Sequence, residues 1–201
     1  MRVIILSKAP VAGQVKTRLM PQYSAQEAAD LQQEMTATVL KKVCSLFDDV
    51  WLVVDDTKHP FFASLQADFT FDLQHQGDGN LGNRLERLLH RSFSVDDEPV
   101  MFLGSDSPHI HITRYQQVIS ALQHHDIVLG AVEDGGYDLL ATSVCEPLLF
   151  QGISWGSSSV LEETVVKAHH LKLSMQVLEL SFDLDRAEDL RRAPPCQWDM
   201  V

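Results

Sequence analysis

The sequence predicts an α/β fold in which short buried strands alternate with amphipathic helices. Short, continuous apolar runs suit strands that are covered on both faces. Between them, apolar residues recur at spacings of three and four, and loops rich in Gly, Asp and Ser follow the runs. The chain has 201 residues, 45% of them hydrophobic, and no internal repeat, so we expect one globular domain with a substantial core.

The first half of the chain repeats the order strand, loop, helix. Ser24 and Glu27 have the spacing of a capping box, which predicts a long helix after the first loop, with one apolar stripe packed on the sheet. The other elements expected here are strands over residues 3–6, 50–54, 69–73 and 99–103 and helices over residues 61–67 and 81–89.

The second half continues the pattern. Serines at positions 157–159 could cap the helix that follows them. We expect helices over residues 115–122, 160–168 and 187–191, strands over 126–130 and 175–180, a further apolar run over 139–141, and a tail that begins at Pro194.

Composition and charge exclude several classes of partner. The formal net charge of −12 argues against nucleic acid or an anionic membrane as the partner, since either demands a broad basic surface. No apolar stretch is long enough to span a bilayer, and the first residues lack the pattern of a signal peptide, so we expect a cytoplasmic protein. The three cysteines, Cys44, Cys145 and Cys196, predict neither a disulfide framework nor a zinc site, and we expect them to be small buried or tail residues.

A basic loop over residues 8–18 follows the first strand in this otherwise acidic chain. It contains Lys8, Lys16 and Arg18 together with Gly and Pro, and such a loop can present backbone amides and charge to a phosphate-bearing ligand. The loop lacks two glycines of a Walker motif and has no dinucleotide-binding fingerprint. Two interpretations follow: a phosphate-binding loop, or a surface turn with solvated cations.

A second candidate is Asp106, which follows the predicted strand over residues 99–103. Ligands of open α/β sheets bind at the carboxyl ends of strands, so Asp106 and the basic loop could meet over one edge of the sheet. A carboxylate facing a bound phosphate suits a divalent metal such as Mg²⁺. The alternative is that Asp106 caps a turn, because Ser-Asp-Ser-Pro is also ordinary turn chemistry.

The segment Glu-Asp-Gly-Gly-Tyr at residues 133–137 also has two interpretations. Its paired glycines permit positive φ or a close backbone approach, and its adjacent carboxylates suggest a positive partner nearby. Otherwise the segment is a tight turn with solvated acids.

Taken together, five ordered motifs resemble a known family, the GT-A-like glycosyltransferases of DUF2064, some members of which are named for arsenosugar biosynthesis. The resemblance covers nearly the whole chain. The motifs are Lys-Ala-Pro…Gly…Lys-Thr-Arg-Leu at residues 8–19, Leu-Gly-Ser-Asp-Ser-Pro at 103–108, Glu-Asp-Gly-Gly-Tyr at 133–137, Ile-Ser-Trp at 153–155, and Asp-Leu-Asp…Asp-Leu at 183–190.

The resemblance implies the nucleotide-diphospho-sugar transferase fold, a single Rossmann-like domain over residues 1–201 with a mainly parallel mixed sheet. It places a nucleotide-binding half at about residues 1–110, an acceptor-side half at about 111–193 and a short tail at 194–201. It also implies kinship with the nucleotidyltransferases that make molybdenum cofactor dinucleotides and the guanylylated precursor of a deazaflavin cofactor.

The activity that the resemblance implies is metal-dependent glycosyl transfer from a nucleotide-diphosphate sugar to a small-molecule acceptor. In this interpretation Asp106 places Mg²⁺ or Mn²⁺ on the diphosphate, and Asp134 is the second metal ligand or the base for the acceptor hydroxyl. The expected phosphate-binding residues are Lys8, Ala9, Pro10, Gly13, Lys16, Thr17 and Arg18, and the expected acceptor-side residues are Gly135, Gly136, Tyr137 and Trp155.

The chain departs from the family's usual pattern at residues 131–132, at Asp138 and at residues 156–157. Asp138 would add an acid near the acceptor side. Two other functions use the same residues. One is nucleotidyl transfer, in which a phosphate-bearing substrate attacks a nucleoside triphosphate, and the other is nucleotide binding without turnover. The sequence leaves the acceptor and the oligomeric state open.

Overall fold

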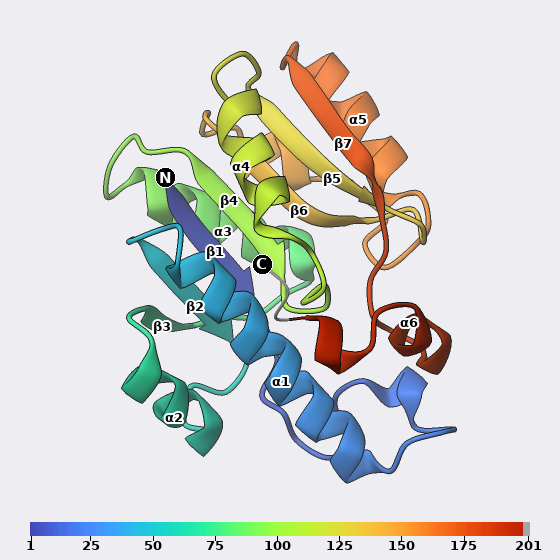
Figure 1. Cartoon of the computed structure of the whole chain (residues 1–201). Helices are drawn as coiled ribbons and strands as arrows, with labels where there is room; N and C mark the ends of the chain where they lie inside the picture. The colour runs from blue at the N-terminus through green and yellow to red at the C-terminus, as the bar shows by residue number, and fades with distance from the viewer. Residues whose placement is uncertain (199–201) are drawn as a thin grey trace. The chain divides into compact units, whose positions relative to one another are not determined.

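The computed structural model describes residues 1–198 (Figure 1). Its strands form a seven-stranded mixed sheet with the hydrogen-bonded order β3-β2-β1-β4-β6-β5-β7, which confirms the predicted α/β class. The strands are β1 (Arg2–Leu6), β2 (Val50–Val54), β3 (Asp72–His75), β4 (Val100–Gly104), β5 (Ile127–Val132), β6 (Tyr137–Thr142) and β7 (Met175–Ser181).

Helices separate these strands along the chain, except between β5 and β6, which follow each other directly. The helices are α1 (Ala25–Cys44), α2 (Pro60–Asp68), α3 (Leu81–Phe93), α4 (Ile112–Ala121), α5 (Val160–His170) and α6 (Ala187–Arg192). Short 3₁₀ turns lie at Thr17–Leu19, Pro147–Phe150 and Pro195–Gln197. No helix within residues 1–198 is both long and apolar enough to cross a membrane.

The chain divides into two compact units, which do not coincide with the predicted halves. Of the described residues, the N-terminal unit comprises Ile4–Gln76, Gly104–Ile112 and residues 183–198. The central unit comprises Met1–Val3, Gly77–Leu103 and Thr113–Phe182. The assignment of the whole chain to one domain stays a prediction.

In the N-terminal unit, local sequence accounts for most of the structure. The Ser24 hydroxyl accepts a hydrogen bond from the Glu27 amide at 3.2 Å, and the Glu27 carboxylate accepts one from the Ser24 amide at 2.7 Å, so the predicted capping box starts α1. Strand β2 has the predicted bounds, and all five of its residues are buried. The strand expected over residues 69–73 is displaced to Asp72–His75, because Phe69 ends α2 instead.

In the central unit, β6 runs antiparallel to β4 and β5, whereas β5 and β7 are parallel. The register of β5 shifts beside Gly130, which is the signature of a β-bulge. Arg114 lies at this irregularity: its guanidinium donates to the Glu179 carbonyl at 2.8 Å and to the Ala131 carbonyl at 3.5 Å. The side chain therefore satisfies carbonyls where the strand ladder is irregular.

Asp138 completes this arrangement and is not a free acid. Its carboxylate is buried and forms an ion pair with Arg114, with Nε 3.1 Å from Oδ2. Burial raises the pKa of Asp138 to about 6, although the neighbouring Arg114 charge acts to lower it. The ion pair and the burial make this carboxylate part of the sheet; its place near an acceptor stays a prediction.

Two smaller expectations also need correction. Helix α5 starts at Val160 as predicted, but the Ser159 hydroxyl donates to Glu163 at 2.6 Å and does not cap the helix. All three cysteines are free; Cys145 is exposed and lies in the connection after β6, so it is neither a buried nor a tail residue.

Candidate functional site

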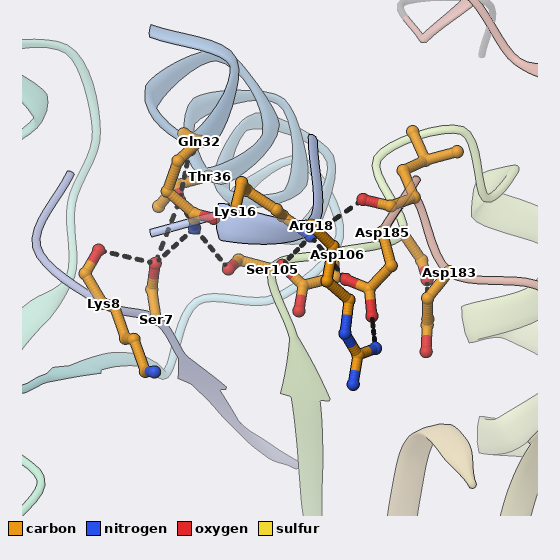
Figure 2. Close-up of polar contacts among 12 residues, drawn as sticks. Ser7, Lys8, Lys16, Arg18, Gln32, Thr36, Ser105, Asp106, Asp183 and Asp185 are labelled. Atoms are coloured by element: carbon orange, nitrogen blue, oxygen red, sulfur yellow. Dashed lines mark hydrogen bonds and ion pairs between the residues drawn. The ribbon is translucent and has the colours of Figure 1, made fainter. Parts of the chain in front are cut away.

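A cluster of one cation and two carboxylates lies in the N-terminal unit (Figure 2). Lys16 comes from the basic loop, Asp106 follows β4, and Asp185 precedes α6. The Lys16 Nζ is 2.8 Å from Asp106 Oδ1 and 3.1 Å from Asp185 Oδ1, and it donates to the Leu184 carbonyl at 2.9 Å. The predicted meeting of the basic loop with Asp106 is thus present in the structure.

The cation is buried while its carboxylate partners face solvent. The Lys16 side chain is 4% exposed, compared with 45% for Asp106 and 32% for Asp185. Burial acts to lower the pKa of Lys16, but the charges and hydrogen bonds of the two carboxylates outweigh it and hold the pKa above its usual value. Lys16 therefore stays charged, and both acids remain accessible to a ligand.

Two other cations of the basic loop are exposed. Arg18 pairs with Asp185 Oδ2 at 2.8 Å but keeps 63% of its side chain exposed. Lys8 is exposed as well, and Figure 2 shows it apart from the carboxylates, with no contact drawn between its side-chain nitrogen and them. These two side chains can contact an anion in solvent without first breaking a buried interaction.

The backbone of the basic loop has an unusual conformation. Lys16 adopts φ 46° and ψ 38°, in the left-handed region that costs a non-glycine residue roughly 1 kcal/mol or more. Gly13 has φ 81° and nothing within 4 Å of the position that a Cβ would occupy. Thr17 is exposed, Pro10 is buried, and the Ala9 amide donates to Asp55 Oδ1 at 2.6 Å, which fixes the start of the loop.

A buried polar network lies directly behind the cluster. The Gln32 amide nitrogen is 3.3 Å from the Ser7 hydroxyl and 3.0 Å from the Ser105 hydroxyl. Thr36 joins the network through a 3.0 Å contact with Ser7. Ser7 precedes Lys8 and Ser105 precedes Asp106, so this network links the two loops that carry the predicted site (Figure 2).

The loop that carries Asp106 is fixed at both ends. Buried Lys42 on α1 donates to the carbonyls of Pro108 at 2.8 Å and Ile110 at 2.9 Å. The Ser107 hydroxyl donates to Asp183 at 2.6 Å. The Leu184 amide also donates to the Asp106 carbonyl at 2.9 Å, so the 183–185 segment is joined to this loop through main chain as well as side chains.

The donor set fits a divalent cation only in part. Within residues 1–198 no group of three or more His, Cys, Asp or Glu side chains could hold a metal. Asp106 and Asp185 nevertheless provide two accessible carboxylates that already share one cation, and Mg²⁺ is commonly held by one or two carboxylates plus ligand phosphates. These residues fit a metal that is completed by a phosphate-bearing ligand.

Asp185 was missed as a site residue by the sequence analysis. The motif at residues 183–190 contained the available signal, since its acids directly follow a predicted strand. Pattern alone does not reveal which of these acids returns to the basic loop. Gln32 and Lys42 were missed because a helical pattern does not distinguish a buried polar side chain from an exposed one.

The predicted residues around Asp134 all lie in the central unit. Asp134 is exposed and accepts a hydrogen bond from the Gly136 amide at 2.9 Å, inside the turn that joins β5 to β6. Gly135 has φ 88°, and a Cβ there would collide with the Ser158 carbonyl. The turn interpretation accounts for this geometry; a role for Asp134, Gly135 and Gly136 in binding or catalysis stays a prediction.

Tyr137 and Trp155 contact each other edge to face, with ring centroids 6.4 Å apart and an interplanar angle of 85°. Burial raises the pKa of Tyr137. A Cβ at Gly82 would collide with the Trp155 indole, so this glycine gives the indole its space. The aromatic pair thus belongs to the packing of the central unit, and its role toward an acceptor stays a prediction.

Several solved structures resemble this one. The chain superposes on a protein from Desulfovibrio desulfuricans G20, assigned by inference as a nucleotide-diphospho-sugar transferase, with a TM-score of 0.86, 26% identity and coverage of 98% of this chain and 94% of that one. For 4-diphosphocytidyl-2C-methyl-D-erythritol synthase from Anaerococcus prevotii, the TM-score is 0.61, with 9% identity and coverage of 96% and 94%. For a CMP:2-keto-3-deoxy-manno-octonic acid synthetase complexed with CTP, it is 0.60, with 10% identity and coverage of 100% and 99%.

No curated protein sequence matches the chain. The family described as "Uncharacterized protein conserved in bacteria (DUF2064)" matches residues 39–157, which is more than half of the chain. This match begins in the second half of α1 and includes Asp106 and the turn that carries Asp134. The chain therefore belongs to the DUF2064 family, on a nucleotide-diphospho-sugar transferase fold.

Proposed function

We propose that the protein is a transferase that moves a glycosyl group from a nucleotide-diphosphate sugar to a small-molecule acceptor, with a divalent metal. The observation that carries this proposal is the cluster of Lys16, Asp106 and Asp185, which presents two open carboxylates beside a loop of cations. The likeness to the Desulfovibrio protein supports the nucleotide-sugar class of ligand.

The proposed roles follow from charge and exposure. Lys8 and Arg18 contact the diphosphate, while Asp106 and Asp185 hold Mg²⁺ or Mn²⁺. When bound, the metal neutralises charge on the departing diphosphate. Asp185 replaces Asp134 as the proposed partner of Asp106 because both Asp106 and Asp185 contact the same Lys16 nitrogen.

In the reaction, the acceptor oxygen forms a bond to the anomeric carbon of the sugar, and the bond from that carbon to the diphosphate oxygen breaks. The nucleoside diphosphate leaves with the electron pair. We assign the acceptor's proton to the exposed Asp134 carboxylate. Gly135, Gly136, Tyr137 and Trp155 would form the acceptor side around it.

A second candidate is nucleotidyl transfer, which is supported by the cytidylyl-type enzymes among the similar structures. Here the same cations would contact the β- and γ-phosphates of a nucleoside triphosphate. A phosphate group of the substrate would attack the α-phosphorus, and pyrophosphate would leave. Such a nucleophile requires no base, so Asp134 would be dispensable.

Calorimetric titration with Mn²⁺ present tests the proposal by comparing nucleotide-diphosphate sugars with the matching nucleoside triphosphates. Preference for the sugar conjugate, with nucleoside diphosphate released on addition of acceptors, is the expected result. Preference for the triphosphate with pyrophosphate release would establish nucleotidyl transfer. Binding without either product would indicate a non-catalytic nucleotide-binding protein.

Asp106→Asn isolates the metal-dependent part of this proposal. It should abolish the dependence of nucleotide binding on Mn²⁺, whereas Asp48→Asn, which neutralises an exposed acid in the same unit, should leave that dependence intact. An Asp106→Asn variant that still requires Mn²⁺ would place the metal elsewhere.

Lys16→Ala should weaken nucleotide binding by roughly 1.5–3 kcal/mol, the value of a charge-assisted hydrogen bond.

A further inference from the structure

The Lys16 ammonium is fully occupied by the protein itself. It has three N–H donors, and the structure gives it three oxygen partners, on Asp106, Asp185 and Leu184. With 4% of its side chain exposed, it has no remaining donor to offer a phosphate. A direct contact between Lys16 and a bound nucleotide therefore requires the ammonium to leave this position.

Lys16 occupies one oxygen of each carboxylate that a metal would use. Asp106 Oδ1 and Asp185 Oδ1 both contact Nζ, and Asp185 Oδ2 contacts Arg18, so a divalent cation held by both carboxylates would compete with the ammonium for them. A divalent ion also matches the charge of two carboxylates better than one ammonium does. The two carboxylates can therefore pair either with the Lys16 ammonium or with a divalent ion.

We infer that Lys16 is a built-in counter-cation that the divalent metal displaces, and that the released ammonium then binds the phosphates of the nucleotide. This inference rests on the proposed function, because it takes Asp106 and Asp185 as the metal ligands. It adds a positioning role in the metal-free protein, where Lys16 holds the two acids together, and a ligand-binding role after the exchange.

The loops on either side of the cluster differ in how firmly they are held. The carboxylate of Asp106 lies on the loop fixed by Lys42 through two carbonyls. Lys16 lies in a left-handed backbone conformation between buried Val15 and exposed Thr17, and nothing lies within 4 Å of the position that a Cβ would occupy at Gly13. Because the segment with the strained backbone carries the ammonium, the ammonium moves and the carboxylates stay.

The exchange couples the two ligands. Metal binding alone must break the contacts of Lys16 without giving the ammonium a new partner. When a nucleotide is also present, its phosphates accept the released ammonium, so metal and nucleotide each strengthen the binding of the other. Removal of Lys16 removes this competition and leaves the metal free to bind the carboxylates alone.

Titration of the nucleotide-free protein with Mn²⁺ tests the competition directly. Lys16→Met should bind Mn²⁺ about tenfold or more tightly than the wild type, because the metal no longer displaces charge-assisted hydrogen bonds. Lys58→Met changes the net charge equally at an exposed position of the same unit and should leave the affinity unchanged. Equal affinity in Lys16→Met and the wild type, or a weaker one in Lys16→Met, would overturn the inference.

Lysine acetylation followed by mass spectrometry tests the displacement in the wild-type protein, so it does not depend on a variant that folds. Without metal, buried Lys16 should react far more slowly than exposed Lys58, which is the internal standard. Saturating Mn²⁺ should raise the rate at Lys16 toward that at Lys58, and added nucleotide diphosphate should lower it again. An unchanged rate at Lys16 under saturating Mn²⁺ would show that the ammonium stays in place.

The outcomes separate this inference from the function on which it rests. If Mn²⁺ binds through Asp106 but Lys16 neither competes nor becomes reactive, the inference fails and the proposed metal site stands. If neither the wild type nor Lys16→Met binds Mn²⁺, with or without nucleotide, the metal-dependent function fails and the inference with it.

Discussion

The two units each contain a cation paired with acids, and the two arrangements differ in what is buried. In the central unit, Arg114 and Asp138 are both nearly inaccessible, at 11% and 5% exposure of their side chains. In the N-terminal unit, only Lys16 is inaccessible, and its acids Asp106 and Asp185 face solvent. An ion pair that is closed on both sides has no access to a ligand, whereas one that is open on the acid side leaves its carboxylates within reach of another cation.

The contacts of the two cations, Arg114 and Lys16, also differ. Arg114 also donates to two carbonyls beside the irregularity in β5, so its loss would leave the buried Asp138 carboxylate without its cation and these two carbonyls without this donor. The acids of the Lys16 cluster would be solvated if their cation left. The energetic cost of removing a cation should therefore be much larger in the central unit.

Arg114→Met should have the largest effect. We expect the free energy of unfolding to fall by about 3–5 kcal/mol, because the buried Asp138 carboxylate loses its partner. Urea denaturation at pH 7 measures this change. Adding Asp138→Leu to Arg114→Met should restore much of the loss, and a single variant as stable as the wild type would contradict the structural role of the pair.

Asp138→Asn should reveal the cost of keeping a buried carboxylate charged. Because burial raises the pKa of Asp138 to about 6 in the folded protein, the folded state binds this proton more tightly than the unfolded state does. The stabilising contribution is therefore present at low pH and is lost as the pH rises through about 6. As the pH falls from 7 to 4, the free energy of unfolding of the wild type should rise by up to roughly 3 kcal/mol relative to that of Asp138→Asn. Parallel pH profiles of the two unfolding free energies would refute this.

Lys16→Met should destabilise the protein by only about 1–2 kcal/mol, between the values for exposed and buried pairs. Its carboxylate partners remain in contact with water after the substitution, so no buried charge is left behind. Urea denaturation in the absence of divalent metal measures the effect. A loss as large as that of Arg114→Met would remove the distinction between the two arrangements.

Arg18→Met should have the smallest effect on stability. The Arg18 side chain is 63% exposed, and its pair with Asp185 is open to water, so we expect a loss of less than about 1 kcal/mol. Because such pairs are screened, the small difference from the wild type should shrink further in 1 M salt. Thermal melts at low and high salt provide the comparison.

Much of the fold could be predicted because its signals are local. The five apolar residues of β2 and the capping box at Ser24 require only neighbours in the sequence. The displacement of β3 shows the limit of this approach: Phe69 and Phe71 have the composition of a strand, yet Phe69 ends α2 and the strand starts at Asp72. Apolar content alone does not determine which residues pair with β2.

The site could be predicted as far as the meeting of Lys16 with Asp106, because the carboxyl ends of strands meet at one edge of an α/β sheet. The burial of Lys16 could not be predicted, since it depends on Asp185 returning from a distant part of the chain. The ion pair of Asp138 could not be predicted for the same reason: a carboxylate beside a tyrosine gives no sign that Arg114, 24 residues earlier, lies against it.

The Lys42 contacts have a consequence for the entropy of ligand binding. Because its ammonium bonds to the carbonyls of Pro108 and Ile110, the loop that bears Asp106 loses its conformational freedom during folding rather than during binding. The entropy lost on binding is then concentrated in the basic loop over residues 8–18. Calorimetry of a Lys42→Met variant would therefore show an added unfavourable entropy of ligand binding, even where the affinity changes little.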